Sequence, residues 1–437
     1  MNKQNENKKG YKKTKVGWIP EEWELVHLGQ CAEILFSNVD KISNNSELPV
    51  RLCNYTDVYY NQYITNNLNF MSATATQTEI EKFTVKKGDV IITKDSETAN
   101  DIAVPAFVIE ELDNVLCGYH LALIRPNSSI LFGEYLSKFF QLHTVRHYFS
   151  TLANGVTRFG LTTQATLYAH IPLPPLPEQK KIAEILSIWD RAIVQMGKLI
   201  NAKTKLKKAL MQQLLTGKRR FKEFNHETNE KKEKEELPER WQKLKLHDFL
   251  QPVSRPIPRP DKEYLALGIR SHGKGTFLRT VKNPDEVMMD TLFEVKEKDL
   301  IVNITFAWEG AIAIVKKSDE GALVSHRFPT YIFKKNRTIP EFFRHTILTK
   351  RFVHQLGLIS PGGAGRNRVM SKRDFLNLVF SIPHIDEQKK ISEVLNELDK
   401  EIDLLRSHLK TFNSQKKGLM QKLLTGAIRV NIAREER

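Results

Sequence analysis

The chain repeats one segment at a fixed interval of 209 residues, and this repeat constrains the fold more than any other feature. Residues 178–182 read Glu-Gln-Lys-Lys-Ile, and residues 387–391 read the same. The full matched segments, 178–217 and 387–426, both end in Leu-Leu-Thr-Gly and share 18 of 40 positions without a gap. Repeats of about 20–50 residues are typical of solenoids and propellers. The much longer interval predicts two copies of one large unit instead.

The duplication extends beyond the matched segments. Residues 20–23 (Pro-Glu-Glu-Trp) match residues 238–241 (Pro-Glu-Arg-Trp), and proline segments at 171–177 and 382–383 precede the two repeats. Between these landmarks lie two variable blocks that resemble each other only at scattered positions. We therefore expect the similar parts to perform one task twice, and the variable blocks to perform related but different tasks.

The order of these parts predicts seven regions. They are a disordered tail (1–14), a first variable block (15–177), a first helix (178–217), a charged linker (218–235), a second variable block (236–383), a second helix (384–430) and a tail (431–437). The first 15 residues are polar and rich in lysine, unlike a signal peptide, and no apolar run approaches the ~20 residues of a membrane span. Cys31, Cys53 and Cys117 lack metal-ligand spacing and even pairing, which fits a reducing interior. A soluble, cytoplasmic protein is expected.

Both repeated segments predict a long amphipathic helix. Apolar residues recur at alternating intervals of four and three, which is the spacing of a coiled-coil seam. The predicted packing residues are Ile182, Leu186, Trp189, Ile193 and Met196 in the first helix and Ile391, Leu395, Leu398, Ile402 and Leu405 in the second. Upstream prolines and the glycines at 217 and 426 would delimit the helices. Either the two helices pack on each other, antiparallel, or each packs only on its own block; the first arrangement is the preferred hypothesis.

The variable blocks predict an α+β class. Short apolar runs such as 89–92, 106–109 and 299–302 are separated by turn residues and indicate strands. Each block ends in a helical stretch, at 134–149 and 341–356. The predicted architecture is therefore two α+β domains separated by two long antiparallel helices that form a coiled coil, with a pseudo-twofold internal repeat.

The charge of the chain indicates a polyanionic partner. The net charge is +16, with +10 across 241–383, +5 across 178–217 and −2 across 1–177. A strong positive excess usually indicates nucleic-acid binding. If the first block also binds DNA, the local placement of its basic residues must outweigh a slightly negative total.

Polar and basic residues in predicted turns are the candidates for contact with DNA bases. Arginine can pair with guanine through two hydrogen bonds, and asparagine with adenine. The candidates are Arg51, Asn54, Lys94, Asn100 and Arg158 in the first block, and Arg270, His272, Lys274, Arg366 and Arg368 in the second. The alternative is that these are ordinary solvated loops whose glycines only satisfy turn geometry.

A search for catalytic motifs finds none that is specific. The glycines near 362–365 lack the Lys-Ser/Thr pair of a phosphate-binding loop. Asp290, Glu294 and Lys296 could be assembled into a nuclease-like cluster, but such triplets arise by chance in a highly charged chain. His120 and His326 have no second metal ligand at a useful spacing. We therefore predict a non-catalytic chain without a metal or cofactor of its own.

The repeated motifs resemble those of a known family. The chain is similar to the specificity subunits of type I restriction–modification systems. The segments that carry the resemblance are 172–179 (Pro-Leu-Pro-Pro-Leu-Pro-Glu-Gln), the repeated helix ending in Leu-Leu-Thr-Gly, 17–23, 268–275 and 307–311. One departure is that the second proline segment keeps only Pro383 and has Asp386 in the place of Pro177.

The resemblance implies a division of labour. Each variable block would be a target-recognition domain for one half of a split double-stranded DNA site, and the paired helices would act as the spacer. Two methylation subunits would dock on the chain, and restriction and translocation subunits would join the larger complex. S-adenosylmethionine, ATP and Mg²⁺ would belong to those partners. Two other functions remain open from the residues alone: a stand-alone DNA-binding regulator or architectural protein, and a metal-dependent nuclease.

Overall fold

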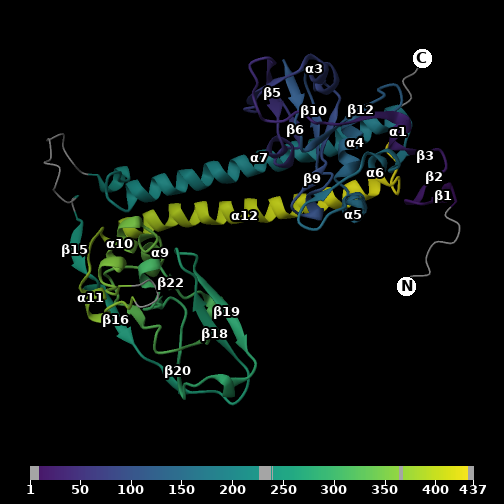
Figure 1. The fold of residues 1–437 in the computed structure, drawn as a ribbon. Helices are drawn as coiled ribbons and strands as arrows, with labels where there is room; N and C mark the ends of the chain where they lie inside the picture. The colour runs from purple at the N-terminus through teal and green to yellow at the C-terminus, as the bar shows by residue number, and fades with distance from the viewer. Residues whose placement is uncertain (1–8, 226–237, 239, 364–367, 432–437) are drawn as a thin grey trace. The chain divides into compact units, whose positions relative to one another are not determined.

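The computed structural model describes residues 9–225, 238, 240–363 and 368–431. The chain divides into two compact units, which we call unit 1 (Met1–Met196 and His408–Arg437) and unit 2 (Gly197–Ser407). Each unit contains one variable block, the first half of the helix that follows this block, and the second half of the other helix (Figure 1). Each unit therefore combines residues from both copies of the repeat.

The two long helices are α7 (Leu176–Leu214) and α12 (Ile385–Leu424). Pro177 lies in the first turn of α7, where its missing N–H removes no helical hydrogen bond. Gly217 and Gly426, just beyond the helix ends, have φ angles of +70° and +69°. These left-handed conformations favour glycine and stop both helices as expected.

Within each unit the helix segments run antiparallel. In unit 1 the rings of Trp189 and Phe412 meet edge to face with centroids 5.5 Å apart. In unit 2, Lys203 Nζ lies 2.8 Å from Glu401 Oε1. The ion pairs Lys416–Asp190 in unit 1 and Lys207–Asp399 in unit 2 join positions that are related by the 209-residue interval. The predicted antiparallel pairing of the two helices and the internal repeat of their contacts are confirmed.

The first block is built from short strands and helices. Its strands are β1 (Tyr11–Thr14), β2 (Gly17–Pro20), β3 (Glu24–His27), β4 (Ala32–Phe36), β5 (Leu48–Cys53), β6 (Tyr63–Ile64), β7 (Met71–Ala75), β8 (Val90–Thr93), β9 (Asp95–Ser96), β10 (Pro105–Val108), β11 (Val115–Cys117), β12 (Leu121–Pro126), β13 (Phe159–Gly160) and β14 (His170–Leu173). Its helices are α1 (Leu28–Cys31), α2 (Tyr55–Tyr59), α3 (Gln77–Phe83), η1 (Ala99–Asp101), α4 (Gly133–Phe140), α5 (His143–Leu152) and α6 (Thr163–Leu167). The main sheet has the order β4-β12-β8-β10-β6, and a second sheet has the order β11-β5-β7.

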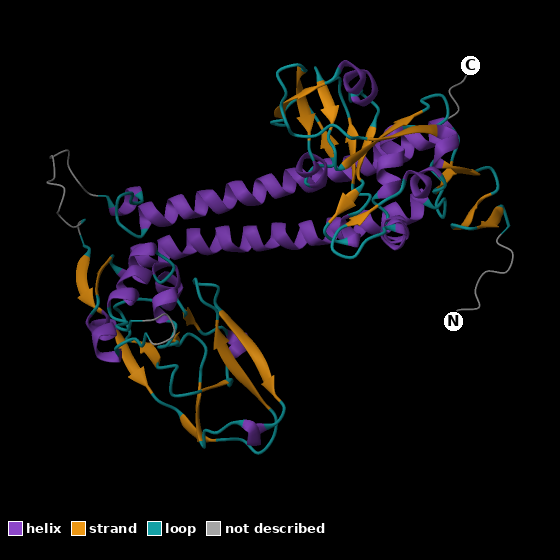
Figure 2. Cartoon of the chain, in the orientation of Figure 1, coloured by secondary structure: helices purple, strands orange, loops and turns teal. Residues whose placement is uncertain are grey.

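The second block has a comparable set of elements (Figure 2). Its strands are β15 (Gln242–Lys245), β16 (Leu250–Val253), β17 (Pro256–Pro258), β18 (Tyr264–Ile269), β19 (Thr276–Val281), β20 (Thr291–Glu294), β21 (Leu300–Val302), β22 (Ile312–Ile314), β23 (Leu323–Val324), β24 (Thr330–Phe333) and β25 (Val379–Ile382). Its helices are α8 (Leu246–Phe249), η3 (Pro284–Glu286), η4 (Ala307–Glu309), η5 (Lys317–Asp319), α9 (Pro340–Thr346), α10 (Lys350–Leu358) and α11 (Lys372–Asn377). The two larger sheets have the orders β16-β24-β21-β22 and β17-β20-β23-β18-β19, and β15 pairs with β25. The predicted α+β class is confirmed for both blocks.

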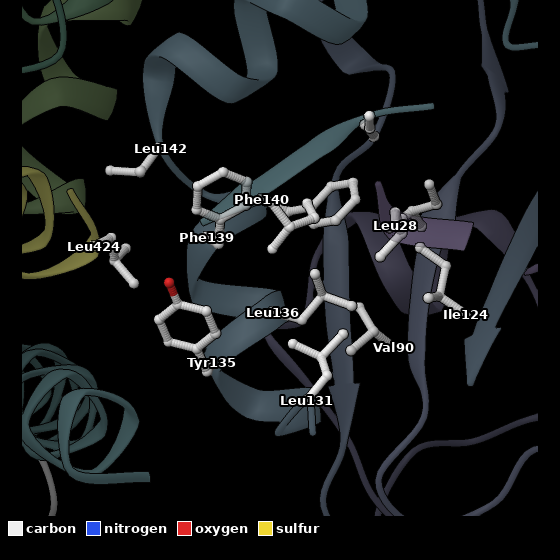
Figure 3. Close-up of a cluster of buried hydrophobic side chains, with 14 of the residues drawn as sticks. Leu28, Val90, Ile124, Leu131, Tyr135, Leu136, Phe139, Phe140, Leu142 and Leu424 are labelled. Atoms are coloured by element: carbon white, nitrogen blue, oxygen red, sulfur yellow. The ribbon is translucent and has the colours of Figure 1, made fainter. Parts of the chain in front are cut away.

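The core of unit 1 is packed on both faces of the main sheet. Side chains alternate along a strand, so Val90 and Ile92 of β8 face one cluster while Ile91 faces another. Helix α4 fills the space between this sheet and the end of α12 (Figure 3). There Tyr135 lies near Leu424, and both are fully buried. Each fully buried side chain of this size contributes about 1.5–3 kcal/mol to stability.

The chain ends differ in part from the expected tails. Residues 11–14 form β1, which pairs with β2 instead of being disordered. The hydroxyl of Tyr11 donates a hydrogen bond to the Gly426 carbonyl at 2.9 Å, so this strand is held against the end of α12 within unit 1. In the expected linker, Lys222–Phe224 forms the turn η2. Residues 1–8, 226–235 and 432–437 of the expected tails and linker lie outside the described residues.

All three cysteines are free and buried. Cys53 in β5 and Cys117 in β11 are neighbours in the parallel register of their strands. Burial raises the pKa of Cys31 to about 11 and raises the pKa of Cys53 and of Cys117. Because the thiolate is the reactive form, these thiols are poor nucleophiles at neutral pH.

No helix among the described residues is long and apolar enough to cross a membrane.

Candidate nucleic-acid interface

Three separate segments of the first block converge on one polar cluster, which we call surface 1. It consists of Lys94, Asp95, Tyr119, His120 and Arg158. The pairing of β13 with β9 brings Arg158 to Asp95, and Arg158 Nη2 donates to Asp95 Oδ1 at 2.9 Å. The same oxygen lies 2.7 Å from His120 Nδ1. Three of these residues were singled out as separate positions in the sequence, and the fold makes them neighbours.

Arg158 is the most accessible donor of surface 1. Its side chain is 58% exposed, whereas that of Asp95 is 16% exposed. The ammonium of Lys94 is already engaged by neighbouring groups. It donates to the Ser37 carbonyl at 2.6 Å and lies 4.6 Å from the centroid of the Tyr119 ring. Burial lowers the pKa of Lys94. Surface 1 therefore offers a guanidinium to a ligand while Lys94 mainly holds the loops together.

The other predicted residues of the first block occupy different places. Asn54 precedes α2 and lines a pocket of about 150 Å³ together with Tyr119 and His120 of surface 1. Arg51 Nε donates to the Asp113 carbonyl at 2.9 Å. Asn100 lies in η1, where its carbonyl accepts a hydrogen bond from Arg146. Asn54 thus borders surface 1, whereas Arg51 and Asn100 make contacts outside it; all three stay predictions as DNA contacts.

In the second block the glycine-containing loop between β18 and β19 lies against η4. The backbone N–H of His272 donates to the Glu309 carbonyl at 2.7 Å, and that of Gly273 donates to the Gly310 carbonyl at 3.1 Å. The hydroxyl of Ser271 donates to Glu309 Oε2 at 2.6 Å. Because these bonds fix the loop backbone, His272 and Lys274 project from a defined position, and both are exposed.

Two arginines of this block lie on aromatic rings. Arg368 is 5.1 Å from the centroid of the Trp308 ring, and Arg270 is 4.8 Å from that of Phe277. Arg368 also donates to the carbonyls of Gly357 and Ser360, at 2.9 and 3.0 Å. We call the set Arg270, His272, Lys274, Trp308 and Arg368 surface 2. Arg366 lies outside the described residues.

Tyr119 and Trp308 are absent from the residues predicted as DNA contacts. Each lies beside a predicted basic residue, but Tyr119 is 25 positions from Lys94 and Trp308 is 60 positions from Arg368. No spacing rule connects positions so far apart. Aromatic rings under cationic side chains hold the donors in place through cation–π attraction, so these two residues belong to the chemistry of the surfaces.

The repeated segments form two equivalent junctions between helices. Junction 2 consists of Trp241, Glu387 and Arg220. The Glu387 carboxylate accepts two hydrogen bonds from the Arg220 guanidinium, both at 2.9 Å, and a third from Trp241 Nε1 at 3.1 Å. The side chains of Arg220 and Glu387 are 6% and 2% exposed. The arginine beyond the end of one long helix therefore pairs with the glutamate at the start of the other.

Junction 1 consists of Trp23, Glu178 and Arg429, each related to its counterpart by the repeat. Trp23 Nε1 donates to Glu178 Oε2 at 3.1 Å, and Arg429 donates to the same carboxylate at 2.7 and 2.9 Å. Glu178 is fully buried, but the Arg429 side chain is 36% exposed. The junctions share their chemistry and differ in the hydration of the arginine.

The glutamine after each glutamate ties the helix to its block. The Gln179 side chain accepts from the Phe132 N–H and donates to the Pro174 carbonyl, both at 2.8 Å. In unit 2 the Gln388 side chain accepts from the Ile339 N–H at 3.1 Å and donates to the Pro383 carbonyl at 2.9 Å. The segment before α12 therefore makes the same contacts although it contains only one proline, Pro383.

His345, which is fully buried in α9, gives unit 2 a defined pH dependence. Its Nε2 bonds to Asn396 Oδ1 at 2.8 Å, and its Nδ1 has no hydrogen-bond partner among the described residues. Burial lowers the pKa of His345 to about 4. In the unfolded chain His345 therefore binds a proton below about pH 6.5, whereas in the folded unit it binds one only below about pH 4.

We expect this difference to remove up to about 3 kcal/mol of unfolding free energy as the pH falls from about 6.5 to about 4. The stability term of His345 is fully present above pH 6.5. Denaturant unfolding of the wild-type protein and of His345→Gln across this range would isolate it. The variant should show a flatter profile; parallel profiles would contradict the assignment.

No group of three or more histidine, cysteine, aspartate or glutamate side chains in the described part of the chain is arranged to hold a metal ion.

Comparison with known proteins identifies the family. The model of the type I restriction modification DNA specificity domain matches residues 20–213 and again 238–411. The putative type I restriction enzyme MjaX specificity subunit of Methanocaldococcus jannaschii is 26% identical over 96% of this chain and 97% of its own length. The type I restriction enzyme MjaVIII specificity subunit of the same organism is 26% identical over 94% of each chain.

The fold is also shared with a solved structure. The S subunit of a type I restriction–modification system from M. genitalium superimposes with a TM-score of 0.55, covering 94% of this chain and 97% of that one at 13% identity. At this identity the likeness concerns the fold. The two family matches cover both copies of the repeat. The chain therefore belongs to the family of type I restriction–modification specificity subunits, which recognise DNA and are not catalytic.

Proposed function

We propose that this chain reads a split double-stranded DNA sequence, with each variable block binding one half-site. The proposal rests mainly on one observation: the helices and junctions are repeated with equivalent contacts, whereas the two polar surfaces have different residues. A duplicated scaffold with divergent surfaces suits the recognition of two different DNA words. We assign the first target-recognition domain to residues 15–177 and the second to 236–383, with spacer helices at 178–217 and 384–430.

Surfaces 1 and 2 are the proposed contact regions. Basic side chains supply affinity through phosphate contacts, and contacts with base edges supply sequence choice. Surface 2 lies in the strongly basic block, so its long-range attraction to DNA is greater. Surface 1 lies in a block with a net charge of −6 across residues 15–177, so its arginine must act locally.

We further propose that the chain acts in the cytoplasm with two methylation subunits and with restriction and translocation subunits. The names of the related proteins, which are specificity subunits of type I restriction enzymes, support this assignment. S-adenosylmethionine, ATP and Mg²⁺ would be bound by those partners. The stand-alone regulator and the nuclease are the alternatives to be tested.

Reconstitution with a methylation subunit tests the proposal. We expect stable co-purification and methylation of one bipartite sequence by the complex but not by the chain alone. Mapping the methylated sites would give both half-sites and their spacer. Site-specific binding without any stable methylation partner would favour a regulator, and cleavage or methylation by the isolated chain would favour an enzyme.

The spacer helices predict a simple length relation. Insertion of four residues into the middle of both α7 and α12 adds about 6 Å, so the preferred spacer should lengthen by about one or two base pairs. Sequencing of methylated sites measures this shift. The same insertion in α7 alone is the control. It puts the apolar residues of α7 out of register with those of α12, so it should lower stability without a defined change in the preferred spacer. An unchanged spacer in the double insertion would contradict the ruler function.

A further inference from the structure

A buried charged network joins the first block to both long helices in unit 1. Its centre is Lys138, whose side chain is 1% exposed. Lys138 Nζ lies 2.6 Å from Asp190 Oδ2 and donates to the Tyr63 hydroxyl at 2.8 Å. Asp190 is also buried and pairs with Lys416 of α12. Lysine is almost never fully buried without such partners. The buried position of Lys138 therefore depends on the other members of the network.

The members of the network come from four elements. Tyr63 belongs to β6 at the edge of the main sheet, Lys138 to α4, Asp190 to α7 and Lys416 to α12. The Tyr63 hydroxyl also donates to Glu134 Oε1 at 2.9 Å. Lys138 is therefore a buried charged link between α4 of the block and α7, whereas Lys416 links one helix to the other.

Unit 2 solves the same packing problem differently. The helix–helix ion pair is kept as Lys207–Asp399. The buried contact from block to helix is the neutral pair of His345 in α9 and Asn396 in α12. A charged contact from block to helix is present as Arg344–Asp399 at 3.5 Å, but its side chains are 48% and 27% exposed. A fully buried charged link is therefore not a general requirement of such a unit.

A buried ion pair resists displacement more than apolar packing does. Apolar contacts are non-directional, so an apolar interface can repack when it shifts. Moving Lys138 away from Asp190 would separate a buried ion pair and leave the lysine charge poorly compensated in the interior. The link therefore allows one position of the first block on its helix pair and penalises neighbouring positions.

We propose that Lys138 is a positioning residue that fixes the first recognition domain on the helix pair and thereby sets the spacer length that the protein accepts. This inference rests on the proposed function. A block held in one position reads its half-site at one distance and one helical phase from the other half-site. A block that can shift on its helices accepts neighbouring spacers.

The test uses the reconstituted complex of the full chain with its methylation subunit. A DNA pool carries the two mapped half-sites at the wild-type spacer and at spacers one and two base pairs shorter or longer. All members compete in one reaction, and the methylated fraction of each is read by sequencing. The ratio between spacers is then independent of the amount of active complex.

Lys138→Met and Lys416→Met form the matched pair of variants. Both remove one buried cation from Asp190, but only Lys138→Met removes a contact between the block and the helices. We expect Lys138→Met to reduce the discrimination between the wild-type spacer and its neighbours about tenfold, with the base preference in each half-site unchanged. Lys416→Met should lower thermal stability while keeping the wild-type spacer ratio.

Tyr63→Phe provides a milder variant if Lys138→Met does not fold, because it removes only the hydroxyl next to Lys138. It should broaden the spacer preference in the same direction and to a smaller extent. Wild-type spacer ratios in both Lys138→Met and Tyr63→Phe, or equal broadening in Lys416→Met, would overturn the positioning role. Absence of any bipartite methylation by the wild-type complex would instead reject the proposed function.

Discussion

Glu387→Ala is expected to destabilise unit 2 by about 3–5 kcal/mol. The substitution leaves the Arg220 guanidinium, which is 6% exposed, without its carboxylate and also removes the acceptor of the Trp241 indole. A buried charge without a partner is among the most damaging single changes in a protein interior. Hydrogen exchange of the first turns of α12 and of the segment around Arg220, followed by mass spectrometry, measures the loss locally.

The equivalent change in the other copy is the internal control. Glu178→Ala should cost less, because the Arg429 side chain is 36% exposed and can regain water. The double variant Glu387→Leu with Arg220→Met should recover a large part of the loss, since no uncompensated charge remains. Equal destabilisation by Glu178→Ala and Glu387→Ala would show that burial of the arginine is not the cause.

Arg158→Ala is expected to relax sequence choice in one half-site and to leave the other unchanged. Loss of a bidentate base contact costs about 1–3 kcal/mol, which corresponds to about 5–150-fold in discrimination. Arg158 is the most exposed donor of surface 1, so it is the residue of this cluster best placed to reach a base edge. Sequencing of the sites methylated by the complex, with competition binding to variant half-sites, measures the effect.

Arg146→Ala is the matched control for charge. It removes one arginine from the same block, at a position whose guanidinium bonds to the Asn100 carbonyl outside surface 1. It should weaken binding slightly and uniformly. A uniform loss with Arg158→Ala would indicate a phosphate contact instead of base readout, and wild-type behaviour would remove Arg158 from the interface.

The sequence predicted the scaffold well because the scaffold is repeated and periodic. The four-and-three spacing of the seam and the glycines beyond the C-terminal ends were sufficient to predict α7 and α12. The antiparallel pairing was the preferred hypothesis, beside the alternative that each helix packs only on its own block. The same pattern did not reveal what lies opposite each seam residue. Ile182 and Leu186, predicted to pack helix on helix, lie in one cluster with the core of the first block as well as with Leu423 of α12.

The junctions were harder to predict, since their partners are distant in the chain. The tryptophans and glutamates were visible as repeats, but Trp23 is 155 residues from Glu178, and Arg429 is 251 residues from it. The arginines lie just outside the matched segments, where the two copies no longer look alike. Asp190 was visible as a repeat of Asp399, but Lys138 carried no repeat signal, because unit 2 has a histidine–asparagine contact instead.

The surfaces were predicted as residue types and not as groups. Lys94 and Arg158 were selected because basic residues in turns suit DNA binding, yet only the pairing of β9 with β13 makes them members of one cluster. Residues 11–14 were assigned to a disordered tail because they are polar and rich in lysine. Backbone hydrogen bonds to β2 outweigh that composition.

The burial of all three cysteines makes the natural chain a suitable background for site-specific labelling. Thiol reagents attack an exposed thiolate, whereas Cys31, Cys53 and Cys117 are at most 1% exposed and have raised pKa values. Ile42→Cys and Met288→Cys would place one reactive thiol on each block, at positions that are 73% and 97% exposed. Fluorophores attached there would report the separation of the two blocks in solution as each half-site is added, without removal of any native cysteine.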